Sequence, residues 1–349
     1  MKKFAVLAVF AAAAASASAQ SSVTLFGIVD LQASSVKNGN VTQRSLDSGG
    51  LQTSRLGFRG VEDLGGGLTA GFHLEAGLNP DVGGAGGTAG KDTKGVEATG
   101  FFNRRSTVSL SGGFGELRLG RDYTANFNVS SRFDAFGSVG FGSVDQLLKG
   151  KTAAFNTDAR YTEARVNNAV SYFLPGNLGG VYGQLQVGAP EGVAGNGYKG
   201  GRIGYAAGPL DVAVSYSQID LFATDKYKTA NVGASYDFGV AKVYALYDQR
   251  KSGANKYTTY ALSASVPLGV GELRASYARG NSNGATIAND DAKLFGLEYV
   301  HNLSKRTAVY AQTGQLRNEG NSALTLGGAS VTGAGFKSTA YGAGIRHSF

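Results

Sequence analysis

The sequence predicts an all-β protein, a 16-stranded antiparallel transmembrane β-barrel with one loop that folds inward to form a constriction. Three observations lead to this fold class. Apolar and polar residues alternate along short segments, glycine-rich turns recur at nearly regular intervals, and 54 glycines accompany only five prolines and no cysteine. The lack of cysteine excludes the small secreted folds that disulfides hold together. The mean hydropathy of −0.11 fits a barrel whose lipid-facing and water-facing residues alternate.

The tight turns set the strand count. Seven turns separate eight hairpins, which predicts 16 strands. From residue 178 onward, the turn centres are spaced by 30 to 34 residues, enough for two strands of about ten residues with a loop and a turn. The seven turns lie at residues 64–67, 112–115, 176–180, 208–209, 238–241, 269–271 and 303–306.

One interval is much longer than the others. The turns near residues 113 and 178 are 65 residues apart, and the surplus falls in residues 124–158, which lack strand alternation. We therefore predict that residues 124–158 form the inward-folded constriction loop. A smaller surplus at residues 82–99 is rich in Gly, Thr and Lys and predicts an exposed loop.

The N-terminus predicts export. Two lysines precede an apolar run at residues 4–15, and Ala17-Ser18-Ala19 has the form of a cleavage site. The run is shorter than the roughly 20 apolar residues that a membrane-spanning helix needs. Residues 1–19 are thus predicted to be a signal peptide and residues 20–349 the barrel. Removing Lys2 and Lys3 leaves 31 basic against 25 acidic residues, without the basic tracts that would suggest nucleic-acid binding.

Strand periodicity is clear in some hairpins and weak in others. In residues 210–216, Leu210, Val212 and Val214 share one face, whereas residues 242–247 place Leu246 on the polar face and match poorly. Aromatic residues recur near predicted strand ends, as in the girdles of membrane barrels. The girdle candidates are Phe26, Tyr123, Tyr172, Tyr236, Tyr299 and Tyr341.

Five stretches in order carry a resemblance to a known family. They are SSVTLFGIVD (21–30), SRLGFRGVEDLGGGL (54–68), FFNRRSTVSLSGGFGELRLGRDY (101–123), RVNNAVSYF (165–173) and the C-terminal GIRHSF. Across nearly the whole mature chain the sequence resembles the general porins of Gram-negative outer membranes, in particular the beta-proteobacterial branch.

The resemblance carries several expectations. It implies an outer-membrane barrel, a homotrimer, contacts with membrane lipid and lipopolysaccharide, and passive diffusion of small hydrophilic solutes and ions. It also implies that the terminal aromatic, Phe349, is the signal that the barrel assembly machinery recognises.

The resemblance also implies a constriction where wall arginines face loop carboxylates. By motif match the wall arginines are Arg55, Arg104 and Arg165. Alternation places Arg59 on the same face as Arg55.

If Val108 and Leu110 face lipid, Arg105 points into the pore instead of Arg104, whereas small outward residues such as Thr107 and Ser109 would suit a trimer contact. Arg104 is preferred and Arg105 is kept as the second choice. Arg118 and Arg274 share the inward phase of their strands.

The loop has fewer carboxylates than expected. Enterobacterial relatives carry Pro-Glu-Phe-Gly where this chain reads Asp134-Ala-Phe-Gly137. Asp134 is therefore the predicted loop carboxylate, with Asp145 in reserve. Opposed charges across a narrow, low-dielectric passage orient and select solutes. Because arginines outnumber these acids, we expect a pore that prefers anions. A structural or adhesive barrel without an open pore is the alternative.

Enzymatic and metal chemistry find little support. The three histidines, His73, His301 and His347, lack metal-like spacing, and no Gly-x-Ser-x-Gly motif surrounds a candidate nucleophile. We expect neither enzyme activity nor a cofactor nor a bound metal.

Overall fold

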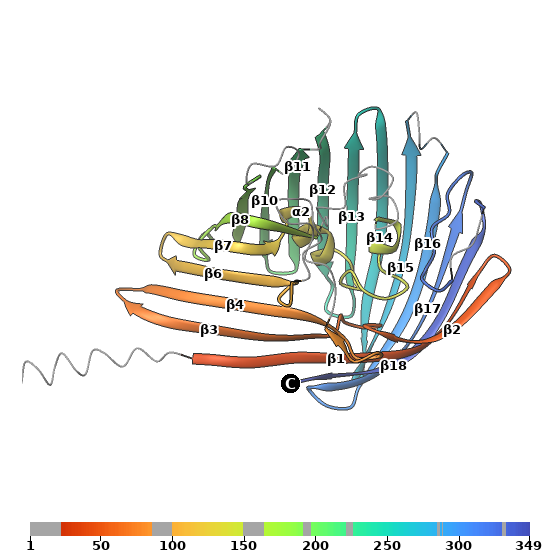
Figure 1. Ribbon diagram of the computed structural model, residues 1–349, viewed down its shortest axis with the longest axis horizontal. Coiled ribbons are helices and arrows are strands. Elements are labelled where there is room, and N and C mark those ends of the chain that lie inside the picture. The colour runs from red at the N-terminus through yellow and green to blue at the C-terminus, as the bar shows by residue number, and fades with distance from the viewer. Residues whose placement is uncertain are drawn as a thin grey trace, which may run out of the picture.

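The computed structural model describes residues 22–85, 100–148, 164–190, 197–220, 226–284, 287, 289–329 and 333–349. The predicted signal peptide and residues 149–158 of the predicted constriction loop lie outside these ranges. Within them, all long strands join one antiparallel sheet that closes on itself (Figure 1). The strands are β1 (Ser22–Asn38), β2 (Val41–Ser48), β3 (Arg55–Gly65), β4 (Leu68–Asn79), β5 (Gly84–Ala85), β6 (Arg105–Gly112), β7 (Gly115–Tyr123), β8 (Arg165–Phe173), β9 (Val181–Gly188), β10 (Tyr198–Ala207), β11 (Leu210–Asp220), β12 (Lys226–Asp237), β13 (Lys242–Ser252), β14 (Asn255–Leu268), β15 (Gly271–Asn283), β16 (Ala292–Asn302), β17 (Thr307–Asn318) and β18 (Lys337–Ser348).

The predicted count of 16 wall strands is confirmed once two elements are grouped. β2 pairs with one half of β1, through Leu31 to Asn38, and β3 pairs with the other half, through Ser22 to Ile28. Both therefore occupy a single position in the wall, interrupted by residues 49–54. β5 has two residues and pairs only with β4. The remaining strands supply one position each, and every predicted tight turn joins two of them.

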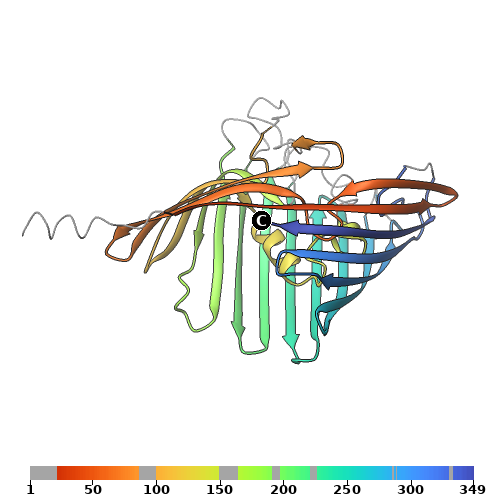
Figure 2. The same ribbon diagram turned by 90° about the horizontal axis from the view of Figure 1, so that it is seen from below.

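The barrel closes between its first and last strands. β1 pairs with β18 from Ile28–Ser348 to Asn38–Ser338. Beyond the ladder, the Gly27 N–H donates to the Phe349 carbonyl at 3.1 Å, and the Phe349 N–H donates back to Gly27 at 3.0 Å. Among the described strands, this closure leaves no open edge in the sheet, as a lipid environment requires. The two strands lie side by side in both views (Figure 2).

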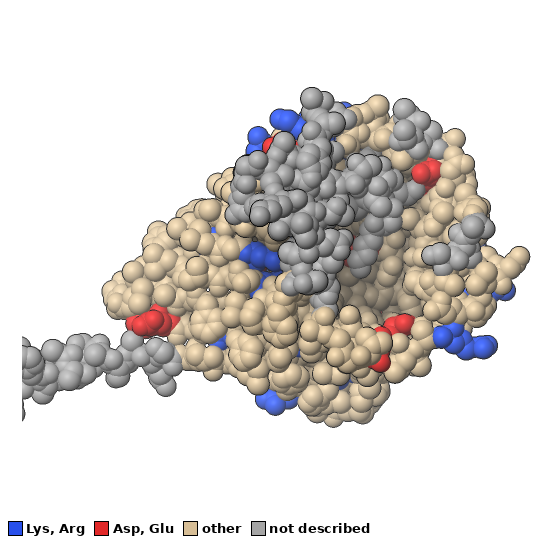
Figure 3. Space-filling view, in the orientation of Figure 1, with Lys and Arg blue, Asp and Glu red and all other residues tan. Residues whose placement is uncertain are grey.

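The outer face carries the apolar half of the alternation. On β11, Val214 and Tyr216 are exposed while Ala213 and Ser215 are buried. Val108 and Leu110 are exposed in the same way on β6, which places Thr107 and Ser109 on the inner face. Of the two alternatives for this strand, the one with Val108 and Leu110 facing lipid is therefore the one that the structure shows. Charged side chains form only a few separate patches on the visible surface (Figure 3).

Two of the six girdle candidates face the interior instead. Phe26 lies opposite Gly57, on the face that carries Glu75, and its ring meets His73 edge-on at 5.3 Å. Tyr123 joins a polar network described below. Tyr236, Tyr299 and Tyr341 are exposed. Phe26 follows the regular alternation of β1, whereas Tyr123 is the last residue of β7, so position near a strand end does not by itself place an aromatic in a girdle.

Within the described residues, no helix combines the length and apolar character that crossing a membrane requires.

Candidate pore constriction

The segment after β7 leaves the wall and runs inside the barrel (Figure 1 and Figure 2). It begins with α2 (Ala125–Arg132), whose N-cap Thr124 accepts a hydrogen bond from the Phe127 N–H at 3.1 Å. This contact satisfies one of the free N–H groups of the first turn. α2 lies against β9 to β12. We call residues 124–148, the described part of the predicted constriction loop, the inner loop.

Polar contacts tie the inner loop to the wall along its length. Arg132 donates to Asp211 of β11 at 2.6 Å and stacks on the Tyr182 ring at 4.7 Å. Further along, the Ala135 N–H donates to Ser263 at 3.0 Å, and Arg250 of β13 donates to the Leu148 carbonyl at 3.1 Å. The wall residues in these contacts come from four different strands, β9, β11, β13 and β14, so the loop is held across a broad sector of the wall.

Apolar side chains seat the loop on this sector. Val129, Phe133, Leu147 and Leu148 are buried against inward-facing wall residues, which we call the loop seat: Ala213, Leu246, Ala278, Leu294 and Leu316. The loop seat explains the poor alternation of residues 242–247. Leu246 faces inward, where the loop shields it from water, so burial stabilises an apolar residue at a position that would otherwise be polar.

Two wall glycines let the loop approach closely. A Cβ at Gly296 of β16 would lie 2.1 Å from the Cα of Gly142, and a Cβ at Gly233 of β12 would lie 2.0 Å from the Phe133 ring. Next to Gly296, the Ser276 hydroxyl donates a hydrogen bond to the Gly142 carbonyl at 2.5 Å. A side chain at position 296 would therefore separate loop backbone from wall backbone.

Asp134 lies on the inner loop, but its carboxylate is occupied within the loop. It accepts hydrogen bonds from the Phe136 N–H at 3.0 Å, the Ser143 hydroxyl at 2.8 Å and the Val144 N–H at 3.2 Å. Complete burial raises the pKa of Asp134 to about 6, and these hydrogen bonds only partly offset that effect. The side chain therefore organises the loop tip and is not a free partner for the wall arginines.

Asp145, the reserve candidate, lies on a different part of the loop. It is half-buried, and its N–H donates to the Ser143 hydroxyl at 3.1 Å. It precedes by three residues Leu148, whose carbonyl is bound by Arg250 of β13. That contact fixes this part of the loop to the loop-seat side of the barrel.

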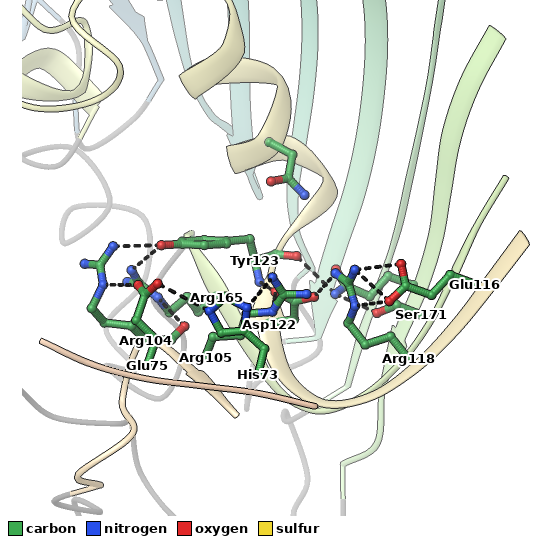
Figure 4. A network of polar contacts seen from close by, with 12 residues as sticks. His73, Glu75, Arg104, Arg105, Glu116, Arg118, Asp122, Tyr123, Arg165 and Ser171 are labelled. Atoms are coloured by element: carbon green, nitrogen blue, oxygen red, sulfur yellow. Dashed lines mark hydrogen bonds and ion pairs between the residues drawn. The ribbon is translucent and has the colours of Figure 1, made fainter. Parts of the chain in front are cut away.

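Arginines gather around Glu75 on the opposite sector (Figure 4). Glu75 of β4 is buried and pairs with Arg104 at 2.5 Å and with Arg55 at 3.7 Å. The Nε2 atom of His73 lies 3.5 Å from the same carboxylate. The structure thus brings two of the three preferred wall arginines onto one acid.

Tyr123 links the third preferred arginine to the others. Its hydroxyl accepts hydrogen bonds from Arg104 at 2.8 Å and from Arg165 at 3.1 Å. The Arg165 guanidinium also lies over the Tyr123 ring at 4.7 Å, and its Nε donates to the Arg104 carbonyl at 2.8 Å. Arg104 and Arg165 each contact more than one group, so these contacts fix the positions of both side chains.

Arg105 enters the neighbouring part of the same network. The β4–β6 register pairs Arg105 with Glu75, so its side chain points inward. Arg104 precedes the strand and reaches the same face from outside the ladder. Arg105 lies 3.3 Å from Asp122, which also accepts from Arg118 at 2.6 Å. Arg118 in turn makes two bonds to Glu116. Both alternatives for the second arginine therefore lie at this site.

We call this set the arginine cluster. It comprises Arg55, Arg104, Arg105, Arg118 and Arg165 with Glu75, Glu116 and Asp122. Five arginines against three carboxylates leave an excess of two positive charges. The bulge between β7 and β8, where Asn168 has φ +51°, shifts the register next to Asp122 and Val166. Such bulges redirect side chains near functional sites.

Two other predicted arginines lie away from the cluster. Arg59 faces inward but is exposed, and its guanidinium lies 5.3 Å from the Phe26 ring centre. Arg274 of β15 pairs with Glu298 at 3.1 Å and with Glu272. A hollow of about 280 Å³ separates the loop tip from the wall here, and Arg55, Arg274 and Arg346 line it together with Asp134.

The sequence profile of the family described as "Gram-negative porin" matches residues 5–321. The chain belongs to this family. Outer membrane porin protein 32 of Delftia acidovorans is 38% identical, and the alignment covers 100% of both chains. The predicted family membership and outer-membrane location are therefore confirmed.

Solved structures give the same result for the fold. The anion-selective porin from Comamonas acidovorans has a TM-score of 0.83 at 38% identity, covering 95% of this porin and 100% of that chain. OmpT of Vibrio cholerae, in a trimer form, has a TM-score of 0.68 at 16% identity, with 94% and 99% covered. The second likeness concerns the fold alone.

Sequence reasoning missed the acidic half of the porin's arginine cluster. Glu75 and His73 alternate with exposed Phe72 and half-buried Leu74 on β4, and Asp122 shares the inward phase of Arg118 on β7. The same alternation that selected the arginines would have selected these residues. Tyr123 carried no such signal, because its role depends on the turn from β7 into the inner loop.

Proposed function

We propose that this porin is a passive diffusion channel for small hydrophilic solutes and ions and that it favours anions. The observation that carries the proposal is the arginine cluster opposite the inner loop, where four arginines pair with three carboxylates and Arg165 joins them through Tyr123. Low-dielectric walls strengthen the field of such a cluster, so an anion is attracted and a cation repelled at the narrowing.

The described part of the loop adds little opposing charge. The Asp134 carboxylate accepts hydrogen bonds from within the loop, and Asp145 lies on the loop-seat side of the barrel. The 38% identical structure from Comamonas acidovorans is called anion-selective, which supports the same preference here. Passive flow needs no catalytic group.

Assembly and processing form part of the proposal. Residues 1–19 act as a cleaved signal peptide, and Phe349 serves as the signal for the barrel assembly machinery. Three copies form a homotrimer surrounded by outer-membrane lipid and lipopolysaccharide, in line with the trimer form described for OmpT. The Phe349 ring lies against Gly27, where a Cβ would come within 2.3 Å of it, so a terminal aromatic has a structural use as well.

Planar-bilayer recording tests the proposal. Refolded protein is added to a bilayer, and the reversal potential is read across a potassium chloride gradient. Conductance steps grouped in threes and a reversal potential of anion sign are expected. A reversal potential of cation sign would contradict the proposed preference. A folded barrel that never conducts would instead favour the structural or adhesive alternative.

A further inference from the structure

A second element enters the barrel at the middle of β1. The strand position beside β1 is interrupted between β2 and β3 by residues 49–54, which we call the mid-wall segment. Asp30 of β1 is fully buried and lies four residues from Phe26, so both side chains face the interior. The Asp30 carboxylate accepts hydrogen bonds from the Leu51 N–H at 2.9 Å and the Gln52 N–H at 2.5 Å. The mid-wall segment is therefore held on the inner side of the wall.

Further contacts fix the mid-wall segment in place. The Tyr310 hydroxyl of β17 donates to the second carboxylate oxygen of Asp30 at 2.5 Å. The Ser54 hydroxyl accepts from the Asp30 N–H at 3.0 Å and donates to the Asp30 carbonyl at 3.1 Å. The Leu51 side chain is buried in a small cluster with Val300 and Tyr310. The segment is thus anchored both in its middle and at its end.

Gln312 of β17 joins the mid-wall segment to the inner loop. Its side-chain nitrogen donates to the Gly50 carbonyl at 3.0 Å and to the Gln32 side-chain oxygen at 2.8 Å. Its side-chain oxygen accepts from the Phe141 N–H at 2.8 Å. Gln312 is buried, where leaving these groups without partners would be costly. We call the contacts of Gln312 with Gly50 and Phe141 the Gln312 junction.

A glycine in the inner loop gives the junction its space. Gly140 has φ +82°, and a Cβ there would lie 2.7 Å from the Gln312 side-chain oxygen and 3.1 Å from the Gly50 carbonyl oxygen. Gly137 has φ +62°, and nothing lies within 4 Å of a Cβ at that position. Both backbone conformations favour glycine. At Gly140 the junction requires the missing side chain as well.

The junction connects the two sides of the narrowing. The mid-wall segment leads directly into Arg55 of the arginine cluster, whose Nε donates to the Thr53 carbonyl at 3.0 Å. The segment and the inner loop face each other across the hollow of about 280 Å³, with Leu51 on one side and Phe136 and Val139 on the other. The separation between these two elements therefore depends on the group that bridges them.

We propose that the mid-wall segment is a second rim of the constriction and that Gln312 is the positioning residue that sets its distance from the inner loop. Gln312 thereby limits the size of the solutes that pass, whereas the arginine cluster selects their charge. This role in solute size rests on the proposed diffusion channel. The junction itself is a property of the folded chain and can be tested without transport.

Hydrogen exchange of the refolded protein tests the junction. Gln312→Leu can neither donate nor accept, so the Phe141 N–H loses its partner. Protection of the Phe141 amide should fall on the order of 10-fold, about the effect of one lost hydrogen bond. The control is Gln218→Leu, which changes a buried glutamine that donates to Asp220 of its own strand. Unchanged protection in Gln312→Leu, or an equal loss in the control, would overturn the proposal.

Swelling of porin-containing vesicles in neutral sugars tests the role in solute size. For Gln312→Leu, the swelling rate in a trisaccharide relative to a monosaccharide should rise, because the two rims are no longer joined. The reversal potential should keep its sign, since every arginine of the cluster remains. An unchanged ratio of rates would overturn the size role. Wild-type vesicles that do not swell would overturn the proposed channel instead, and hydrogen exchange would still decide the junction.

Two glycine variants test the junction with Gln312 intact. Gly140→Ala and Gly137→Ala place the same strain on the backbone, but the new Cβ meets Gln312 and Gly50 at the first position and open space at the second. Gly140→Ala should lower the protection of the Phe141 amide and raise the ratio of swelling rates, and Gly137→Ala should leave both as in the wild type. Equal effects would assign them to backbone strain and overturn the proposal. This pair decides the matter if Gln312→Leu does not refold.

Discussion

The inner wall has two sectors that differ in character although they are built from the same kind of strand. On β3 to β8, inward positions hold the arginine cluster. On β11 to β17, inward positions hold the loop seat, with Leu246, Leu294 and Leu316 buried. The inner loop accounts for the difference, because it covers one sector and leaves the other facing the lumen. Inward orientation alone therefore does not make a residue polar; access to water does.

Removing positive charge from the uncovered sector should have the largest effect. The triple variant Arg55→Gln, Arg104→Gln, Arg165→Gln should shift the reversal potential toward cation selectivity, since three of the cluster's five arginines are lost. Reversal potentials across a salt gradient measure the shift.

A control is needed because Glu75 would be left buried without its partners, which is destabilising. Adding Glu75→Gln to the triple removes that penalty. A matched triple, Arg44→Gln, Arg279→Gln, Arg317→Gln, neutralises exposed arginines outside the cluster. The assignment fails if the cluster variant keeps wild-type selectivity or if the matched triple shifts it equally.

Disturbing the covered sector should have a smaller effect, on conductance and not on the sign of selectivity. In Gly296→Val, the new side chain meets Gly142 and pushes the inner loop off β16 into the lumen. Overpacking of this kind costs about 1–3 kcal/mol. We expect a lower single-channel conductance. Gly176→Val, at a turn with open space around it, is the control. Wild-type conductance in the Gly296 variant would show that the close contact is unimportant.

The smallest expected effect is on the inner loop's pH dependence. The pKa of Asp134 is about 6 in the folded protein against 3.8 for an ordinary Asp. Protonation therefore favours the folded loop, and this stabilisation is present below pH 3.8 and is lost as the pH rises through about 6. The amides of Phe136, Ser138 and Val144 should gain hydrogen-exchange protection, corrected for intrinsic rates, as the pH falls from 7 to 4.

The variant Asp134→Asn isolates this effect. An amide keeps one acceptor oxygen but cannot titrate, so the same three amides should lose their pH-dependent protection. Wild-type pH dependence in Asp134→Asn would assign the effect to another group.

The barrel could be predicted from local chemistry. Tight turns need glycine or small polar residues, and those seven sites fixed the number of wall strands. The outward faces could be predicted too, because lipid requires apolar side chains at Val214 and Val108 whatever the rest of the chain does.

The contacts of the inner face depend on tertiary structure and were harder to predict. Leu246 looked like an error in the alternation until the loop that covers it was placed. Asp134 looked like a pore-lining acid because its neighbours in sequence did not show that Phe136, Ser143 and Val144 fold back onto it. Arg55, Arg104 and Arg165 were found from motifs. Alternation alone would place Glu75 on the inner face, but its pairing with Arg55 and Arg104 depends on how the strands are arranged in the sheet.

The many attachments of the inner loop have a consequence for how the channel sorts solutes by size. The loop is fixed to the wall at Asp211, Ser263, Ser276 and Arg250, on four different strands. An opening bounded by a fixed rim has one width and not a distribution of widths. We therefore expect its molecular-weight limit to be a sharp threshold, so that a nutrient slightly above the limit is excluded at any concentration.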